Sequence, residues 1–306
     1  MGALAPYLVD PDVTDVFING DRGLFVDRGE GAVRDAQWRA AEREVRDLAT
    51  ALIGLGGRHI DEATPCVDVR IEGGIRVHAV LPPVSTGGTL VSVRVPRLAQ
   101  PTLSELGELG AFAPGVREWL LGVVRARANL LITGAAGTGK TTLLAALLGE
   151  APPHERIVSI EDVAELRVTH PHHVALEAKQ ANLEGAGSVG LARLVREALR
   201  MRPDRLVVGE CRGEEVRELL SALNTGHDGG AGTLHANGLD DVPARLEALG
   251  ALAGLDDRAL ARQAVSAIGL VLHLERSPVG VRCLARVGTL RIADERLAIE
   301  EVTPWL

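Results

Sequence analysis

The sequence predicts an α/β protein in which a small α+β domain precedes a larger domain built on a mostly parallel, doubly wound sheet. Three observations support this fold class. Short alternating strands fill roughly the first 95 residues. Strands then alternate with helices from about residue 115, which is typical of a parallel sheet. An apolar strand, a glycine-rich loop and a Leu-rich helix follow one another at 129–150. We expect domains at 1–98 and 115–306, joined by a linker at 99–114.

The elements of the first domain follow from local patterns. Residues 13–29 alternate apolar and polar positions on both sides of Asn19-Gly20, a dipeptide that favours hairpin turns. Residues 66–83 repeat this pattern around two adjacent glycines, and 89–96 read as a further strand. Residues 36–56 carry apolar side chains at helical spacing and end in glycines, so they predict a helix.

The second domain alternates short apolar runs with amphipathic segments. Apolar runs followed by turn residues predict buried strands, and apolar residues three and four positions apart predict helices. The expected strands are 129–134, 156–162, 205–210 and 231–236, and the expected helices are 141–150, 189–201 and 214–226. Because ligands of doubly wound sheets bind at the carboxyl ends of the strands, we look for function there.

Composition narrows the function classes. The formal net charge of −8 gives no overall positive field to attract nucleic acid, and seven aromatic residues offer few stacking platforms, so we expect no direct nucleic-acid binding. Three distant cysteines without a CxxC pair argue against a zinc ribbon and fit a reducing cytosol. The sequence shows no signal peptide and no apolar run near the ~20 residues that span a bilayer. We therefore expect a cytoplasmic protein.

The segment GAAGTGKT at 134–141 matches the phosphate-binding loop pattern G-x-x-x-x-G-K-[ST]. Its glycines let backbone amides approach the phosphates of ATP, and the following helix directs its amino end at the anion. Lys140 is expected to reach the β- and γ-phosphates, and Thr141 to ligate Mg²⁺. The alternative is a glycine turn without function. The expected nucleotide-binding residues are Gly134, Ala135, Ala136, Gly137, Thr138, Gly139, Lys140, Thr141 and Thr142.

Two further strands end in carboxylates. RLVVGE at 205–210 places Glu210 at the carboxyl edge of the sheet, where it could polarise the attacking water or bind Mg²⁺. Gly209 stands where such a strand usually has Asp. SIEDVAEL at 159–166 places Glu161 as a second catalytic candidate and Asp162 as a metal candidate. The alternatives are a solvated carboxylate for Glu210, and acids at a helix amino terminus for 159–166.

The glycine-dense stretch GHDGGAGTLHANG at 226–238 contains two histidines. A metal site with His227, Asp228 and His235 lacks the further ligand that a tetrahedral set needs. A second hypothesis makes the glycines a hinge and His235 a catalytic sensor of the γ-phosphate. The histidines of HPHH at 170–173 are expected on the solvated surface.

Three arginines lie near the carboxyl-terminal end of the first domain. Arg76, Arg94 and Arg97 lie on or after its last strands, and an arginine delivered from a neighbouring subunit can stabilise the charge of phosphoryl transfer. Surface or interdomain salt bridges are the alternative role for each of them.

Four segments in order, GAAGTGKTT, SIEDVAEL, REALRMRPDRLVVGECRG and LNTGHDGGAGTLHANG, resemble the Walker A, Asp box, Walker B and His box of type II/IV secretion ATPases. The likeness is greatest to the tight-adherence (TadA/CpaF-like) pilus assembly ATPases. VTDVFINGDRGLFVDRGEG and the segment that begins at DEATPCVDVR resemble the amino-terminal domain of that family. The absence of CxxC separates the chain from type II ATPases with a zinc module, and Lys179 stands where Arg is expected.

The resemblance implies a RecA-like ATPase domain and a homo-hexamer that uses ATP and Mg²⁺. It makes Glu210 the Walker B glutamate, assigns Glu161 and Asp162 to the Asp box, and makes His235 the His-box histidine. It also makes Arg94, with Arg76 or Arg97, the arginine that acts on a neighbour's nucleotide. Such rings are peripheral to the inner face of the cell membrane, where they act on platform proteins to power pilus assembly or secretion. A DNA-transfer ATPase of conjugation and an ATP-binding scaffold without turnover are the alternatives.

Overall fold

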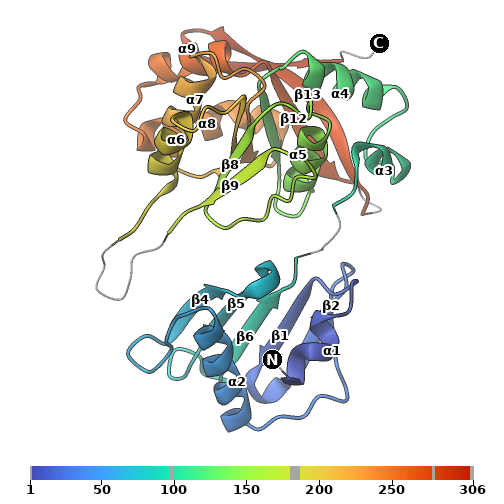
Figure 1. Ribbon diagram of the computed structural model, residues 1–306, viewed down its shortest axis with the longest axis vertical. Helices are drawn as coiled ribbons and strands as arrows, with labels where there is room; N and C mark the ends of the chain where they lie inside the picture. Colours follow the sequence, from blue (N-terminus) through green and yellow to red (C-terminus); the bar gives the residue numbers. More distant parts are fainter. Residues whose placement is uncertain (1, 97–99, 180–186, 278–279, 304–306) are drawn as a thin grey trace. The chain divides into compact units, whose positions relative to one another are not determined.

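The computed structural model describes residues 2–96, 100–179, 187–277 and 280–303. The chain forms two compact units, Met1–Ala99 and Gln100–Leu306 (Figure 1). Arg97, one of the expected arginines, lies outside the described residues. The predicted fold class is confirmed, because an α+β unit precedes a unit built on a mostly parallel sheet.

The first unit is an antiparallel sheet with a helix on one face. Its six described strands run in the spatial order β3 (Ala32–Arg34), β2 (Leu24–Asp27), β1 (Asp15–Asn19), β6 (Leu90–Arg94), β5 (Arg76–Val80) and β4 (Cys66–Arg70). After the short α1 (Ala5–Leu8), the long helix is α2 (Glu42–Leu55), whose apolar face packs on alternate strand residues to form the core of this unit. Both predicted hairpins, β1–β2 and β4–β5, are present.

The predicted helix 36–56 was wrong at its start, because α2 begins only at Glu42. The preceding chain adds β3 to the sheet edge, and the Asp35 side chain accepts the backbone N–H of Gln37 (2.7 Å), which holds a turn. The helix then begins where the Glu44 carboxylate accepts the N–H of Ala41 (2.7 Å), a contact typical of a helix amino terminus.

The second unit is an eight-stranded sheet between two helical layers. In spatial order the described strands are β14 (Arg296–Val302), β13 (Arg282–Ala293), β12 (Leu270–Arg276), β7 (Leu130–Gly134), β11 (Ala231–His235), β10 (Arg205–Cys211), β8 (Ile157–Glu161) and β9 (His173–Glu177). All neighbours from β12 to β9 are parallel, and β13 and β14 pair antiparallel at one edge. The predicted strands β7, β8, β10 and β11 are confirmed.

The helices cover both faces of this sheet, as a doubly wound fold requires. On one face lie α3 (Leu103–Glu108), α4 (Val116–Arg125) and α5 (Lys140–Gly149). On the other lie α6 (Leu191–Leu199), α7 (Glu215–Leu223), α8 (Val242–Leu252) and α9 (Asp257–Ala267). Along β7 the side chains alternate between these two cores, with Leu131 in one and Ile132 in the other.

Part of the segment expected as a linker packs into the second unit. The Thr102 hydroxyl accepts the N–H of Glu105 (3.2 Å) and the Glu105 carboxylate accepts the N–H of Thr102 (2.7 Å), a reciprocal cap that starts α3. Leu103 is fully buried and Phe112 is almost so, both against α4 and α5.

The expectation that residues 170–173 form a solvated surface was wrong. The three histidine rings are half-buried, and each is hydrogen-bonded. His173 begins β9 and its Nε2 lies 2.8 Å from the Ser159 hydroxyl, while His172 Nε2 lies 2.9 Å from Arg156 Nη1. These contacts tie the edge strand β9 to β8, so the histidines are structural.

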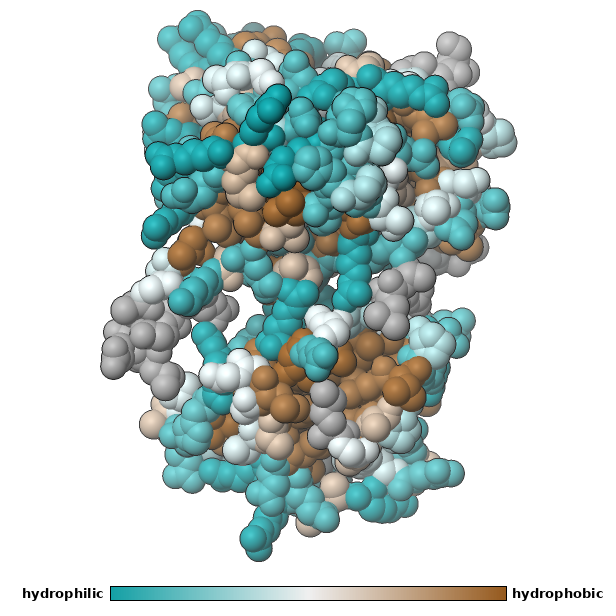
Figure 2. All heavy atoms as spheres, viewed as in Figure 1, coloured by the Kyte–Doolittle hydropathy of each residue, from teal (hydrophilic) through white to brown (hydrophobic). Residues whose placement is uncertain are grey.

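Exposed large apolar residues of the described chain include Val9, Leu109 and Leu252. On the face drawn in Figure 2, hydrophilic residues predominate over the second unit, with hydrophobic residues between them. Within the described ranges no helix is long and apolar enough to cross a bilayer.

Candidate functional site

The loop between β7 and α5 turns sharply at its glycines. Gly134, Gly137 and Gly139 all have positive φ angles (149°, 73° and 96°). A side chain at Gly134 is also excluded by space, since a Cβ there would lie 2.5 Å from the Leu274 carbonyl and 2.6 Å from Oγ1 of Thr138. The Thr138 hydroxyl is buried and donates to the Ala135 carbonyl (2.9 Å), which closes the turn. The loop therefore leads directly into the amino terminus of α5.

Lys140 lies at the centre of this loop. Its ammonium donates to the carbonyls of Gly134 (2.9 Å) and Ala135 (3.0 Å), so the loop curves around the charge. Burial lowers the pKa of Lys140, the carboxylate of Glu210 opposes this, and the Arg212 guanidinium adds to it. Thr141 and Thr142 follow in the first turn of α5, where helix N–H groups are free of intrahelical partners. This arrangement suits an anion such as a nucleotide phosphate.

Glu161 ends β8 as expected, but it is buried (5% exposed) and its carboxylate is engaged. Oε1 accepts the N–H groups of Glu165 (3.2 Å) and Leu166 (3.0 Å), which fixes the turn after β8. The side chain lies against Gly209, where a Cβ would approach Cγ of Glu161 to 2.4 Å. Gly209, the residue that departs from the usual strand-ending Asp, therefore provides the space that Glu161 fills.

Glu210 has a different environment from Glu161. The register of β10 against β11 shifts between Val208 and Cys211, and such bulges redirect side chains near functional sites. Its carboxylate is partly exposed and accepts a bond from Nη2 of Arg212 (2.6 Å). It is also close enough to Lys140 to influence that residue's pKa. Glu210 therefore lies beside the phosphate loop with an accessible carboxylate.

Asp162 and Glu165 complete a group of charges at this edge. Both are exposed, and both contribute to raising the pKa of Arg212, after the larger effect of its hydrogen bond to Glu210. Within the described residues no group of three His, Cys, Asp or Glu side chains is arranged to hold a metal ion alone. Mg²⁺ commonly takes one or two protein ligands and completes its shell with phosphates and water. Among the expected ligands, Glu210 and Asp162 offer carboxylates of this kind, and Thr141 offers a hydroxyl.

The two histidines of the segment 226–238 lie at opposite edges of the sheet. His235 ends β11 and pairs in register with Gly134, so it lies next to the first residue of the phosphate loop. His227 precedes β11 and lies at the amino edge, with Nδ1 3.2 Å from the Ala222 carbonyl. Five strand residues at ~3.3 Å each separate the two histidines by roughly 16 Å. The hypothesis of one metal site that contains both histidines was wrong.

The hinge hypothesis for the glycines of this segment was also wrong for Gly230 and Gly232. A Cβ at Gly230 would lie 2.4 Å from Cδ2 of Leu223, and one at Gly232 would lie 2.9 Å from Cδ2 of Leu219. These glycines permit close packing of α7 on β11. Thr233, which follows Gly232, is buried, and its hydroxyl donates to the Gly209 carbonyl (2.5 Å).

The arginines of the first unit form a row on the sheet face opposite α2. Arg70, Arg76 and Arg94 are direct cross-strand neighbours on β4, β5 and β6. Like charges in register destabilise a sheet. Asp68 lies 3.6 Å from Arg76 and Asp15 lies 3.5 Å from Arg94, which offsets part of this repulsion. Such a row suits contact with an anion.

Sequence reasoning missed three residues of these sites. Arg70 is recognisable only once the register places it beside Arg76. Arg212 follows Glu210 by two residues, and the alternation of a strand could have placed both on one face. His273 on β12 is fully buried, with Nδ1 2.8 Å from the Thr133 hydroxyl one residue before the phosphate loop, and burial lowers its pKa. A histidine inside an apolar strand was the available signal for it.

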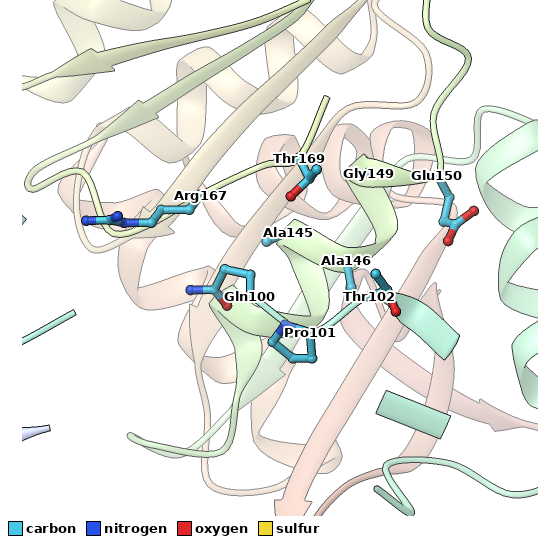
Figure 3. A pocket seen from close by; sticks show the side chains of 9 residues that line it. All are labelled: Gln100, Pro101, Thr102, Ala145, Ala146, Gly149, Glu150, Arg167 and Thr169. Atoms are coloured by element: carbon cyan, nitrogen blue, oxygen red, sulfur yellow. The ribbon is translucent and has the colours of Figure 1, made fainter. Parts of the chain in front are cut away.

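A pocket of about 180 Å³ lies beside the carboxyl-terminal half of α5 (Figure 3). It is lined by residues 100–102 just before α3, by the carboxyl-terminal half and end of α5, and by Arg167 and Thr169. Figure 3 shows Gln100 close to Ala145, while the Arg167 side chain extends away from α5. None of the sequence-predicted site residues lines it.

Comparison with known proteins gives consistent results. A family model described as type II/IV secretion system protein matches residues 2–283. The chain is 49% identical over 310 residues to a protein of Mycobacterium tuberculosis (strain H37Rv) whose name provisionally assigns it to conjugal transfer, covering 99% of this chain and 88% of that protein. It is 35% identical over 266 residues to the type IV secretion system protein PtlH of Bordetella pertussis, covering 80% and 78%.

Solved structures share the fold. The crystal structure of the pilus retraction motor PilT with bound ADP matches with a TM-score of 0.65 and 20% identity, covering 98% of this chain and 82% of that one. At this identity the likeness concerns the fold alone, and it extends over both units of the chain.

Proposed function

The chain belongs to the type II/IV secretion system protein family, and on that premise we propose that it is a Mg²⁺-dependent ATPase that drives a secretion or pilus machine. The observation that carries the proposal is the convergence at one sheet edge of the glycine loop with Lys140, the accessible carboxylate of Glu210, and His235 in register with Gly134. A phosphate cradle, a candidate base and a candidate sensor are the parts that phosphoryl transfer to water requires.

The residues would divide the work as follows. The backbone of 134–139 and Lys140 bind the β- and γ-phosphates, while Thr141 and one carboxylate, Glu210 or Asp162, hold Mg²⁺, which neutralises charge on the phosphates. Glu210 orients and deprotonates the attacking water. The environment of Glu161 argues against that role for it, because its carboxylate is buried and bonded to two backbone N–H groups. Glu161 instead holds the turn that carries Asp162.

At the level of the cell, we propose a cytoplasmic homo-hexamer, peripheral to the inner face of the membrane, that acts on platform proteins. Assembly of tight-adherence pili is the specific role that the sequence motifs favour. Support comes from the family match. Cells that carry only the Lys140→Ala chain should lose pili or secretion while they retain normal levels of the protein.

Steady-state hydrolysis by the purified chain tests the enzymatic part. Phosphate release should require ATP and Mg²⁺, and EDTA should stop it. If the folded chain binds ATP with Mg²⁺ and releases no phosphate, alone or with its membrane partner, the scaffold alternative replaces the motor.

A DNA-transfer role is the second candidate, because the M. tuberculosis relative carries a conjugal transfer name. The net charge of −8 weighs against direct contact with DNA. Tight DNA binding that weakens steeply with salt, together with DNA-stimulated hydrolysis, would rank this candidate first.

His235→Ala should lower the ATP turnover number by about 10-fold or more and change the nucleotide dissociation constant by less than about threefold. The reason is that a sensor acts on the transition state, whereas the phosphate loop supplies ground-state binding. Turnover assays and titration with a fluorescent ATP analogue separate the two effects. His227→Ala, at the opposite sheet edge, is the matched control; an equal loss in both variants would contradict the assignment.

Arg94→Ala should remove turnover in a homogeneous ring, if Arg94 acts on the nucleotide of a neighbour. Mixing Arg94→Ala chains with Lys140→Ala chains should then restore part of the activity, because some interfaces combine an intact arginine with an intact loop. Activity measured across mixing ratios should pass through a maximum. Arg22→Ala, a change in an exposed turn of the same unit, is the control. A flat profile near zero at every ratio would refute action in trans.

A further inference from the structure

We propose that Arg212 is a positioning residue that holds the carboxylate of Glu210 in the orientation needed for ATP hydrolysis. The inference rests on the proposed function, in which Glu210 acts on the attacking water. It assigns a role to a side chain that the Walker B pattern alone leaves unexplained.

The contact between the two residues is specific. Nη2 of Arg212 donates to Oε2 of Glu210 at 2.6 Å, the distance of a charge-assisted bond. Oε2 is thereby engaged, and Oε1 is the oxygen that would act on the attacking water in the proposed reaction. The carboxylates of Asp162 and Glu165 also attract this guanidinium, so it stays at the edge where the phosphate loop lies. The arrangement fixes the rotation of the Glu210 carboxylate.

The backbone that carries Arg212 is held by a buried residue. Oε1 of Glu215 accepts the N–H of Arg212 (2.5 Å) and the N–H of Gly213 (2.7 Å), and Glu215 is only 5% exposed. These bonds join the end of β10 to the start of α7. The base of the Arg212 side chain is therefore fixed by the fold, although its guanidinium reaches into solvent.

Exposure determines which measurement is informative. The side chain of Arg212 is 65% exposed, and ion pairs in such positions contribute little to folding stability. An effect of its removal on stability is therefore expected to be small. The rate of hydrolysis depends more strongly on the position of the Glu210 carboxylate, because a misplacement of about 1 Å in an active site can cost roughly 100-fold in rate. A lower kcat with an unchanged unfolding midpoint would therefore show that Arg212 positions Glu210. A lower unfolding midpoint would show a structural role instead.

The test compares Arg212→Gln, Arg212→Lys and the control Arg217→Gln, which removes the same charge from an exposed position on α7. We expect Arg212→Gln to lower kcat by about 10- to 100-fold, with KM, the dissociation constant for ATP and the unfolding midpoint close to those of the wild type. Arg212→Lys should recover part of kcat, because it restores the charge without the planar guanidinium. Arg217→Gln should match the wild type.

A double variant identifies the partner through which Arg212 acts. Glu210→Gln together with Arg212→Gln should be no slower than Glu210→Gln alone, since a residue that acts only through Glu210 has nothing left to position. Losses in kcat that add up in the double variant would overturn the inference. A raised dissociation constant for ATP in Arg212→Gln would also overturn it, because it would mean that Arg212 contacts a phosphate directly. Equal kinetics of Arg212→Gln and Arg217→Gln, with Glu210→Gln inactive, would overturn this inference alone. Full activity of Glu210→Gln would overturn the proposed role of Glu210 as well.

Discussion

Glu210→Gln should lower the ATP turnover number by roughly 10²- to 10⁴-fold, the range over which general base catalysis contributes, while ATP binding is retained. The amide keeps the size of the side chain but cannot accept a proton from water. Lys140→Ala should lower both the turnover number and the affinity for ATP, because removal of the ammonium also weakens binding of the phosphates. Phosphate release and equilibrium titration with an ATP analogue, both in Mg²⁺, measure the two effects separately.

Glu161→Gln is the informative comparison for Glu210→Gln. Its carboxylate accepts two backbone N–H groups and fills the space above Gly209, so the amide must turn its NH₂ group away from them. We expect lower folding stability and a smaller loss of turnover than in Glu210→Gln. If Glu161→Gln were folded normally and slower than Glu210→Gln, the assignment of the base would have to be reversed.

The sequence was sufficient where local structure depends on adjacent residues. The strand, glycine loop and helix at 130–149 were predictable because the glycines, Lys140 and the start of α5 all lie within eight residues, and Gly134, Gly137 and Gly139 each have a positive φ angle. The strand–helix order was also local in origin, since β7, β8, β10 and β11 are short apolar runs between helices.

Contacts between distant segments were not predictable in this way. In the sequence, Gly209 stands where a Walker B strand usually has Asp. Its structural role becomes clear only from the packing, because Glu161 of the neighbouring strand fills the space that a side chain at Gly209 would occupy. The glycines before and within β11 looked like a hinge, but Gly230 is required by Leu223 of α7. Likewise, three separate strands must be set in register before Arg70, Arg76 and Arg94 form a row. Packing and register, rather than residue type, decide these roles.

Glu155 forms a buried ion-pair network between distant segments, and this network is expected to contribute to folding stability. Its buried carboxylate accepts bonds from Arg127 (2.5 Å) and Arg205 (2.5 Å), and Arg205 is itself only 3% exposed. Arg205 also donates to the Val124 carbonyl (2.9 Å), and Arg127 donates to the carbonyls of Asp204 (2.6 Å) and Asp228 (2.9 Å). The three side chains thus join α4, the start of β10 and the loop before β11, at the edge opposite the nucleotide.

Glu155→Ala should destabilise the second unit by about 3–5 kcal/mol, because it leaves the Arg205 charge buried without its partner. Denaturant unfolding measures this loss, and the control is Glu118→Ala, whose ion pair with Arg117 is exposed and should cost less than about 1 kcal/mol. Exchange of Glu155 and Arg205 together for apolar residues of similar volume should recover much of the loss, since the cost comes from the unpaired charge. Equal stability of Glu155→Ala and Glu118→Ala would show that water reaches Arg205 and that the network is not a buried one.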